Sequence, residues 1–253
     1  DLISQFDTYM AKELPAQLQH WTDQELFQLV GPDAAEKYNE TIVEIIKLRT
    51  LQFQKQQQQK VWGMFGIRLH ELCFGSENQK TMSFLHLVGS FFYYTAQYSE
   101  AESLLRRSLS LREKLLGSNH IDTAESLNDL GVLLTAKGEY EAADPLYRRA
   151  LIITEQELGS NHPSTAARLG NLGSFLHDVG DYVQAEILLS KALGISELSL
   201  GSDHPDTSTK LNMLASLMVD KGDYEVAGSL YRRALAIAEL ALGPDHPETG
   251  SCL

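Results

Sequence analysis

The chain repeats itself with a period of 42 residues. Four residue types each recur at this spacing. The tyrosines are Tyr98, Tyr140, Tyr182 and Tyr224, and the glycines are Gly75, Gly117, Gly159, Gly201 and Gly243. The histidines are His120, His162, His204 and His246, and the threonines are Thr81, Thr123, Thr165, Thr207 and Thr249. A period of this length indicates one structural unit copied along the chain. Stacks of such units usually bind other molecules rather than catalyse reactions, so the repeat constrains both fold and function.

The apolar residues of one unit predict a pair of helices. Leu127, Leu130 and Leu134 lie on one helical stripe, because they are spaced three and four residues apart. Gly138 follows, and glycine commonly ends a helix in the left-handed conformation. A second apolar stripe begins after Tyr140, so each unit is expected to be helix, tight turn, helix and loop.

The loop between units carries the signals of one helix end and one helix start. Gly159 is expected to end the second helix, and Pro163 stands where a first helical turn tolerates proline. Asn161 or His162 would cap that turn. The recurring histidines are therefore interpreted as linker or cap residues. They cannot share one metal ion, because successive helix pairs lie on the order of 15–20 Å apart.

Small residues recur where the helices of a pair should touch. They are Gly89, Gly131, Gly173 and Ala215 in one register, and Ala101, Ala143, Ala185 and Ala227 in another. Small side chains let two helices approach closely, and neighbouring pairs must stack because one pair cannot bury both of its faces. The predicted fold is all-α, a right-handed superhelical solenoid of antiparallel helix pairs with a concave surface.

The repeat resembles the tetratricopeptide repeat in its 42-residue form. The turn of that repeat is matched three times, at Gly138–Tyr140–Ala143, Gly180–Tyr182–Ala185 and Gly222–Tyr224–Ala227. The first copy departs from it, with Ala96 in place of the glycine. The "LGxxHPxT" linker and the "YRRAL" segment are similar to those of kinesin light chains and nephrocystin-3-like proteins.

Two domains are expected. Residues 75–253 form an array of about four repeats that start near residues 81, 123, 165 and 207, with a truncated further repeat at 249. Residues 1–74 do not carry the repeat signature and are expected to form a helical N-terminal cap. The alternative is that they are the tail of an upstream domain, since some signalling ATPases that the chain resembles place such repeats after their nucleotide-binding module.

Composition excludes several classes of partner. The net charge of −13 argues against nucleic acid, which needs a basic surface, and against an anionic membrane surface. No apolar run approaches the 18 or so residues that a membrane helix needs. The two cysteines, Cys73 and Cys252, give no disulfide framework, so a cytoplasmic location is expected.

No catalytic or cofactor motif is present in the sequence. The segment Gly75–Thr81 resembles a phosphate-binding loop, but Gln79 stands where that loop needs glycine, and the segment coincides with an inter-repeat linker. The arginine pairs Arg106–Arg107, Arg148–Arg149 and Arg232–Arg233 are interpreted as an outer face paired with acidic residues one turn away, rather than as an anion-binding ladder. The chain is therefore predicted not to be an enzyme and to hold no cofactor or metal.

The resemblance implies that the first helix of each pair lines the concave groove. The candidate peptide-binding residues are Asn128, Asp129, Val132, Asn171, Ser174, Asn212, Met213 and Ser216. An asparagine amide both donates and accepts, so it can hold the backbone of an extended peptide.

The charge of the groove is expected to select the peptide. The family's clamp for acidic chaperone tails needs Lys or Arg at positions that here carry Ser83, Glu125, Ala167 and Thr209. Asp129, Asp178 and Asp220 are expected to make the groove negative, which favours a neutral or basic peptide.

The predicted function is that of a protein-interaction scaffold or adaptor that holds an extended peptide or a partner helix. One alternative is a sensor or regulatory arm of a larger signalling ATPase. The other is weak self-association, through the N-terminal helices or the end of the array at Thr249.

Overall fold

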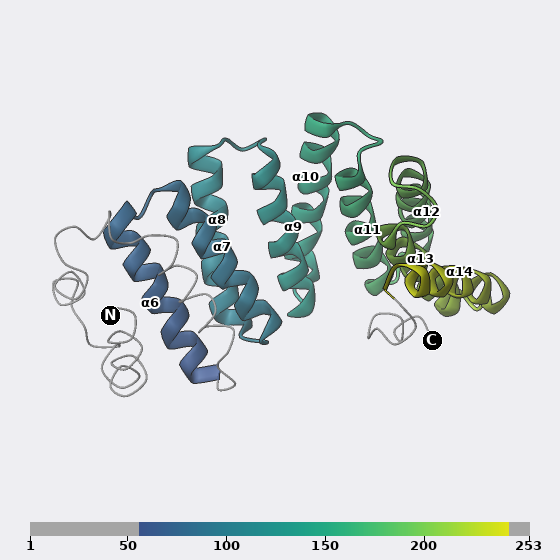
Figure 1. Ribbon diagram of the computed structural model, residues 1–253, viewed down its shortest axis with the longest axis horizontal. Helices are drawn as coiled ribbons and strands as arrows, with labels where there is room; N and C mark the ends of the chain where they lie inside the picture. Colours follow the sequence, from purple (N-terminus) through teal and green to yellow (C-terminus); the bar gives the residue numbers. More distant parts are fainter. Residues whose placement is uncertain (1–55, 243–253) are drawn as a thin grey trace. The chain divides into compact units, whose positions relative to one another are not determined.

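The computed structural model describes residues 56–242, which contain nine α-helices and no strand (Figure 1). The chain divides into two compact units, one up to Leu115 and one from Leu116. The predicted boundary between residues 74 and 75 stays a prediction, because residues 1–55 lie outside the described part. The repeat positions Gly243, His246 and Thr249, and Cys252, also lie outside it.

The first unit contains three described helices. They are α6 (Gln56–Phe74), α7 (Gln79–Tyr94) and α8 (Tyr98–Leu115). Helix α7 packs against both α6 and α8. Met82, Leu85 and Phe92 of α7 are fully buried, and Phe65 of α6 and Leu105 of α8 are buried as well, so all three helices contribute to the core.

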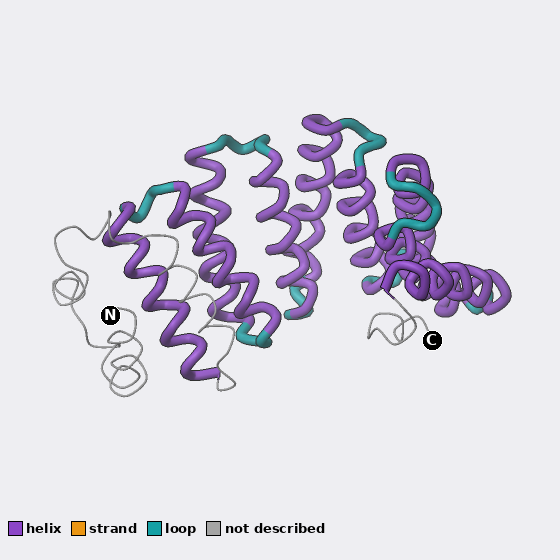
Figure 2. Tube along the Cα trace, in the orientation of Figure 1, coloured by secondary structure: helices purple, strands orange, loops and turns teal. Residues whose placement is uncertain are grey.

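The second unit contains three consecutive helix pairs. They are α9 (Ile121–Ala136) with α10 (Tyr140–Leu158), α11 (Pro163–Asp178) with α12 (Tyr182–Ser199), and α13 (Pro205–Lys221) with α14 (Tyr224–Leu242). Short loops join the helices (Figure 2). The first helices also touch one another in order, α9 against α11 and α11 against α13. The predicted helix, turn, helix and loop order is therefore confirmed for these repeats.

The glycine register and the threonine register meet at the inter-repeat joints. At each joint a fully buried threonine donates its Oγ1 hydroxyl to the carbonyl oxygen of the glycine six residues before it. The bonds are Thr81–Gly75 at 2.8 Å, Thr123–Gly117 at 2.9 Å, Thr165–Gly159 at 2.8 Å and Thr207–Gly201 at 2.9 Å. These glycines have φ between +88° and +103°, which an L side chain rarely adopts, so the turn needs glycine.

The periodic histidines cap the first helices. In each case the ring nitrogen Nδ1 accepts a hydrogen bond, 3.1 Å long, from the backbone N–H two residues later. The caps are His120 on α9, His162 on α11 and His204 on α13. Of the two candidates for the cap of α11, His162 is therefore the right one and Asn161 is an exposed loop residue. The interpretation of these three histidines as cap residues is confirmed.

The recurring small residues bring the two helices of each pair close together. A Cβ atom built on Gly131 would lie 3.1 Å from the ring of Tyr147, and one on Gly173 would lie 2.8 Å from Leu189. In the first unit, Gly89 stands in the same relation to Leu105, at 2.9 Å. The close approach that the sequence predicted is therefore real, and a larger residue at these positions would push the pair apart.

The turn between α7 and α8 is strained. Ala96 has φ +58° and is the only non-glycine residue of the described part with positive φ. Gly138, Gly180 and Gly222 occupy the same position in the later repeats, with φ between +78° and +85°. The left-handed conformation that the turn requires is therefore imposed on an alanine in the first copy, at a cost of about 1 kcal/mol.

Replacing Thr165 with valine should weaken the array. Valine keeps the shape of threonine but removes the hydroxyl that donates to Gly159, so we expect a loss of about 1–2 kcal/mol in the free energy of unfolding, measured by urea denaturation. Thr209→Val is the matched control, because Thr209 is exposed and bonds only within its own helix. Equal losses in both variants would contradict the role of the joint.

Replacing Ala96 with glycine should stabilise the protein. Glycine adopts positive φ without steric cost, so the free energy of unfolding should rise by about 0.5–1 kcal/mol. Ala136→Gly is the control. Because Ala136 is an exposed helical residue, this variant should lose about the same amount of free energy of unfolding instead of gaining it. Thermal denaturation of both variants measures the difference, and a lower melting temperature for Ala96→Gly would refute the strain.

Candidate functional site

The eight candidate peptide-binding residues all lie on the first helices of the second unit. Helix α9 carries Asn128, Asp129 and Val132, α11 carries Asn171 and Ser174, and α13 carries Asn212, Met213 and Ser216. Because these three helices touch one another in order, the residues form one row across neighbouring repeats. We call this row the first-helix face. Seven of the eight are half-buried and reach the surface, whereas Asn128 is only 3% exposed.

The asparagines of neighbouring repeats are hydrogen-bonded to each other. The Nδ2 group of Asn171 donates to Oδ1 of Asn128 over 2.8 Å. Asn128 in turn donates from Nδ2 to the Asp129 carboxylate over 3.2 Å. Since Asn128 is buried and both ends of its amide are engaged, its place is to orient Asn171 and Asp129, and not to touch a ligand itself.

Two cations on the first-helix face were not singled out from the sequence. Arg168 on α11 and Lys210 on α13 lie 42 residues apart, in the register just after Ala167 and Thr209. Ala167 and Thr209 belong to the register of the acidic-tail clamp, whereas Arg168 and Lys210 lie one residue later. The recurrence of a basic residue at the repeat spacing was the signal that could have found them.

Burial dominates the electrostatics of these two cations. Desolvation lowers the pKa of Arg168, and the carboxylates of Asp129 and Glu125 act against this shift. Desolvation likewise lowers the pKa of Lys210, with Asp206 acting against it and the nearby Arg168 adding to it. Arg168 thus partly compensates the negative charges of Asp129, which belongs to the first-helix face, and of Glu125 on the same helix.

A glycine makes the room for Lys210. A Cβ atom on Gly170 would lie 3.1 Å from Lys210 Nζ and 3.3 Å from Met213 Sδ. Gly170 occupies the repeat position that carries Asn128 in α9 and Asn212 in α13. The asparagine row is therefore interrupted at α11, and the lysine side chain of α13 lies in the space.

The acids near the ends of the first helices are partly compensated as well. Nε2 of His177 and the Asp220 carboxylate are 2.6 Å apart, which ties the end of α11 to that of α13. Partial desolvation raises the pKa of Asp178, while the neighbouring His177 acts to lower it. Of the three acids expected to make the groove negative, Asp129 therefore has Arg168 of the following repeat beside it, and Asp220 has His177 of the preceding repeat.

The arginine pairs of the second helices bond within the protein. Arg106 pairs with Glu102 at 2.7 Å and Arg148 with Asp144 at 2.9 Å, each one turn away. Arg233 pairs with Glu197 at 2.6 Å. The predicted pairing with an acid one turn away is therefore confirmed for Arg106 and Arg148, whereas Arg107 pairs with Glu71 and Arg149 donates to the backbone carbonyl of Ser118. In the third pair, Arg232 donates instead to the backbone carbonyl of Gly228.

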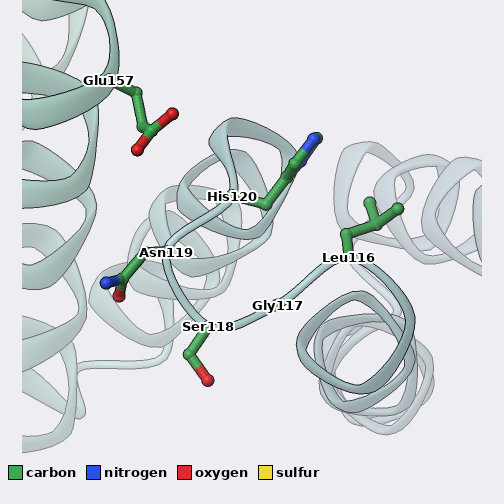
Figure 3. Close-up of a pocket in the computed structure, with 6 residues that line it drawn as sticks. All are labelled: Leu116, Gly117, Ser118, Asn119, His120 and Glu157. Carbon is green, nitrogen blue, oxygen red and sulfur yellow. The ribbon is translucent and has the colours of Figure 1, made fainter.

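The inter-repeat joint before α9 forms an open pocket (Figure 3). It is lined by Leu116, Gly117, Ser118, Asn119, His120 and Glu157. His120 is occupied as the cap of α9, and Arg149 donates to the Ser118 carbonyl oxygen over 3.0 Å. The corresponding segment Gly75–Thr81 is built the same way, with Asn78 as the cap of α7, so its likeness to a phosphate-binding loop is only in sequence.

Neither a metal cluster nor a membrane span is found in the described part of the chain. Residues 56–242 contain no group of three or more His, Cys, Asp or Glu side chains that could hold an ion. None of their helices is both long enough and apolar enough to cross a membrane.

The sequence profile of the tetratricopeptide repeat matches residues 80–156, 168–239 and 206–253. These segments make up more than half of the chain, so the chain belongs to the tetratricopeptide repeat family. Repeats of this family typically form scaffolds for protein interaction, and this chain is a repeat scaffold of that class. Among curated proteins, no sequence matches the chain.

Solved structures share the fold at low sequence identity. BtubC (BKLC) from P. vanneervenii is 20% identical with a TM-score of 0.68, over 93% of each chain. A Podosopora anserina protein described as a kinesin light chain with nearly identical TPR-like repeats is 22% identical with a TM-score of 0.63, over 81% of this chain and 98% of its own. The apo form of RapI is 19% identical with a TM-score of 0.64, over 79% of this chain and 70% of its own. The resemblance to kinesin light chains and the all-α solenoid are thereby confirmed.

Replacing the buried Lys210 with methionine should raise stability at neutral pH. Folding lowers the pKa of Lys210, so the unfolded chain holds the proton more tightly. The free energy of unfolding therefore rises with pH from the lowered pKa up to the ordinary value of 10.5, and Lys210→Met should lack this part of the rise. Urea denaturation of the wild type and the variant at neutral and at alkaline pH measures this difference in the free energy of unfolding. Thr209→Met is the control that should keep the wild-type pH dependence, because Thr209 is exposed and carries no titratable group.

Proposed function

We propose that the chain is a scaffold or adaptor that holds an extended peptide across the first-helix face of α9, α11 and α13. The observation that carries this proposal is the hydrogen bond between Asn171 and Asn128, which orients an amide at the meeting of two repeats. The bond uses one N–H of Asn171 and leaves its Oδ1 for a ligand. An amide offers a donor and an acceptor, which is what the backbone of an extended peptide requires whatever its side chains.

The dimensions of the repeat suit an extended peptide. The first helices of neighbouring repeats touch one another, and packed helices lie about 8–10 Å apart where they touch, whereas an extended chain advances about 3.3 Å per residue. A peptide that crosses the first helices therefore passes one helix about every three residues. Half-buried polar residues, Ser174 and Ser216 among them, stand one turn beyond the asparagines and supply further contacts on α11 and α13.

Charge favours a neutral peptide segment. Arg168 lies near Asp129 and Glu125, and His177 contacts Asp220, so these acids are not free to select a basic ligand. The positions where the family binds acidic chaperone tails carry Ser83, Glu125, Ala167 and Thr209, which offer no cation. Hydrogen bonds to the peptide backbone, and not charge, are therefore the main source of affinity that we propose.

A peptide-array screen tests this proposal. We expect Asn171→Ala/Asn212→Ala to weaken binding of the captured peptides about thirtyfold, since each of the two lost hydrogen bonds contributes about 1 kcal/mol. Asn128 is left unchanged because it is buried. The matched control is Asn119→Ala/Asn161→Ala, which removes two exposed loop asparagines.

The two variants are compared only after circular dichroism shows that both keep the wild-type melting temperature. Peptides held equally by the wild type and by Asn171→Ala/Asn212→Ala would refute the site on the first-helix face. Peptides lost equally by both variants would also refute it.

A further inference from the structure

Helix α12 carries a row of exposed apolar side chains on its outward face. Val183 is 69% exposed, Ile187 56% and Leu198 85%. Gly194 lies between the last two, and the spacings of four, seven and four residues place all four on one side of the helix. We call these four residues the α12 stripe. Apolar side chains this exposed lose a favourable burial energy unless something covers them.

The stripe is specific to α12 among the second helices that the structure describes. The residues at the repeat positions of Val183, Ile187 and Gly194 are Ser99, Ser103 and Ser110 in α8, Glu141, Pro145 and Ile152 in α10, and Glu225, Ser229 and Ala236 in α14. The centre of each of these three helices also carries an arginine pair, whereas α12 has Ser190–Lys191. Lys191 Nζ is bound to Glu155 of α10 at 3.0 Å, so its charge is compensated within the chain.

The stripe is complementary to itself. In an antiparallel pairing about the midpoint of Ser190 and Lys191, Val183 lies opposite Leu198 and Ile187 lies opposite Gly194, because each pair is equally far from the midpoint. A Cβ atom on Gly194 would meet nothing within 4 Å, so the glycine is an open hollow on the helix surface. The side chain of Ile187 is the knob that such a hollow accepts.

We infer that α12 pairs with α12 of a second copy of this chain, antiparallel and about a two-fold axis, through the stripe of Val183, Ile187, Gly194 and Leu198. A two-fold contact requires one surface to fit itself, and the stripe does so at both of its apolar pairs. In the same pairing of α10 or α14, Glu141 or Glu225 would stand at the position of Val183, so the outer apolar pair is absent there.

The dimer is expected to be weak. One helix pair buries less than the roughly 1,200 Å² of a standard interface, so dissociation in the micromolar to millimolar range is expected. The stripe lies on a second helix and the first-helix face on first helices, so this inference does not rest on the proposed function. Loss of dimerisation would leave peptide binding unchanged, and the two failures are distinguishable.

Sedimentation equilibrium over a range of protein concentrations tests the inference. The wild-type chain should show a mass that rises from monomer towards dimer, and Leu198→Glu should weaken this association at least tenfold. Leu240→Glu is the matched control, because Leu240 occupies the same repeat position on α14 and is 80% exposed. A mass that stays monomeric in the wild type, or equal effects of the two variants, would overturn the inference.

A disulfide tests the geometry independently of stability. Ser190→Cys in a Cys73→Ser/Cys252→Ser background places a thiol beside the two-fold axis of each copy. The Cα atoms of the two cysteines then lie close enough to bond, which takes about 4.4–6.8 Å. Mild oxidation should give a covalent dimer with this variant and not with Ser229→Cys, which places a thiol at another exposed position, on α14. Equal cross-linking of both variants would overturn the proposed pairing.

Discussion

The hydrogen bond from a buried threonine hydroxyl to a glycine carbonyl is the contact on which the described repeats depend. It closes the loop between one helix pair and the next, while the glycine turns the chain at positive φ. In the second unit a histidine side chain then caps the helix that follows. All of these bonds are made within seven residues, so the joint can form the same way wherever the segment recurs. The joint thereby determines where each first helix begins and which of its residues face the neighbouring repeat.

Because the joints are alike, the repeats differ mainly in the side chains on their helix faces. Gly170 replaces an asparagine, and Lys210 of the next repeat lies in the space. Helix α12 has lost the arginine pair and the acidic residue that the other second helices of its unit carry, and its surface is apolar instead. A regular scaffold leaves single repeats free to specialise, since each one contacts only its neighbours.

Much of the fold could be predicted from the chain, and the reasons are local. Gly138 was expected to end a helix in the left-handed conformation, and it has φ +78°. Gly131 and Gly173 were expected at close helix contacts, and they lie there. The departure at Ala96 marked the one residue of the described part that takes the strained conformation in place of glycine. Each of these predictions rests on a residue whose backbone preference or size is a property of that residue alone.

Of the candidate site, the sequence could place the residues but not their surroundings. It placed all eight on three first helices, since the helical period and the repeat period decide which side chains share a face. It could not show that Asn128 is buried beneath Asn171, or that Arg168 lies beside Asp129 and close to Lys210. These contacts join residues about 40 positions apart, so they exist only once neighbouring repeats stack. The sequence by itself thus determined the repeat, its joints and its helix faces, because these depend on local bonds and spacing. Burial, charge compensation and the exposure of the α12 stripe were decided by the tertiary structure, because they depend on how one repeat covers the next.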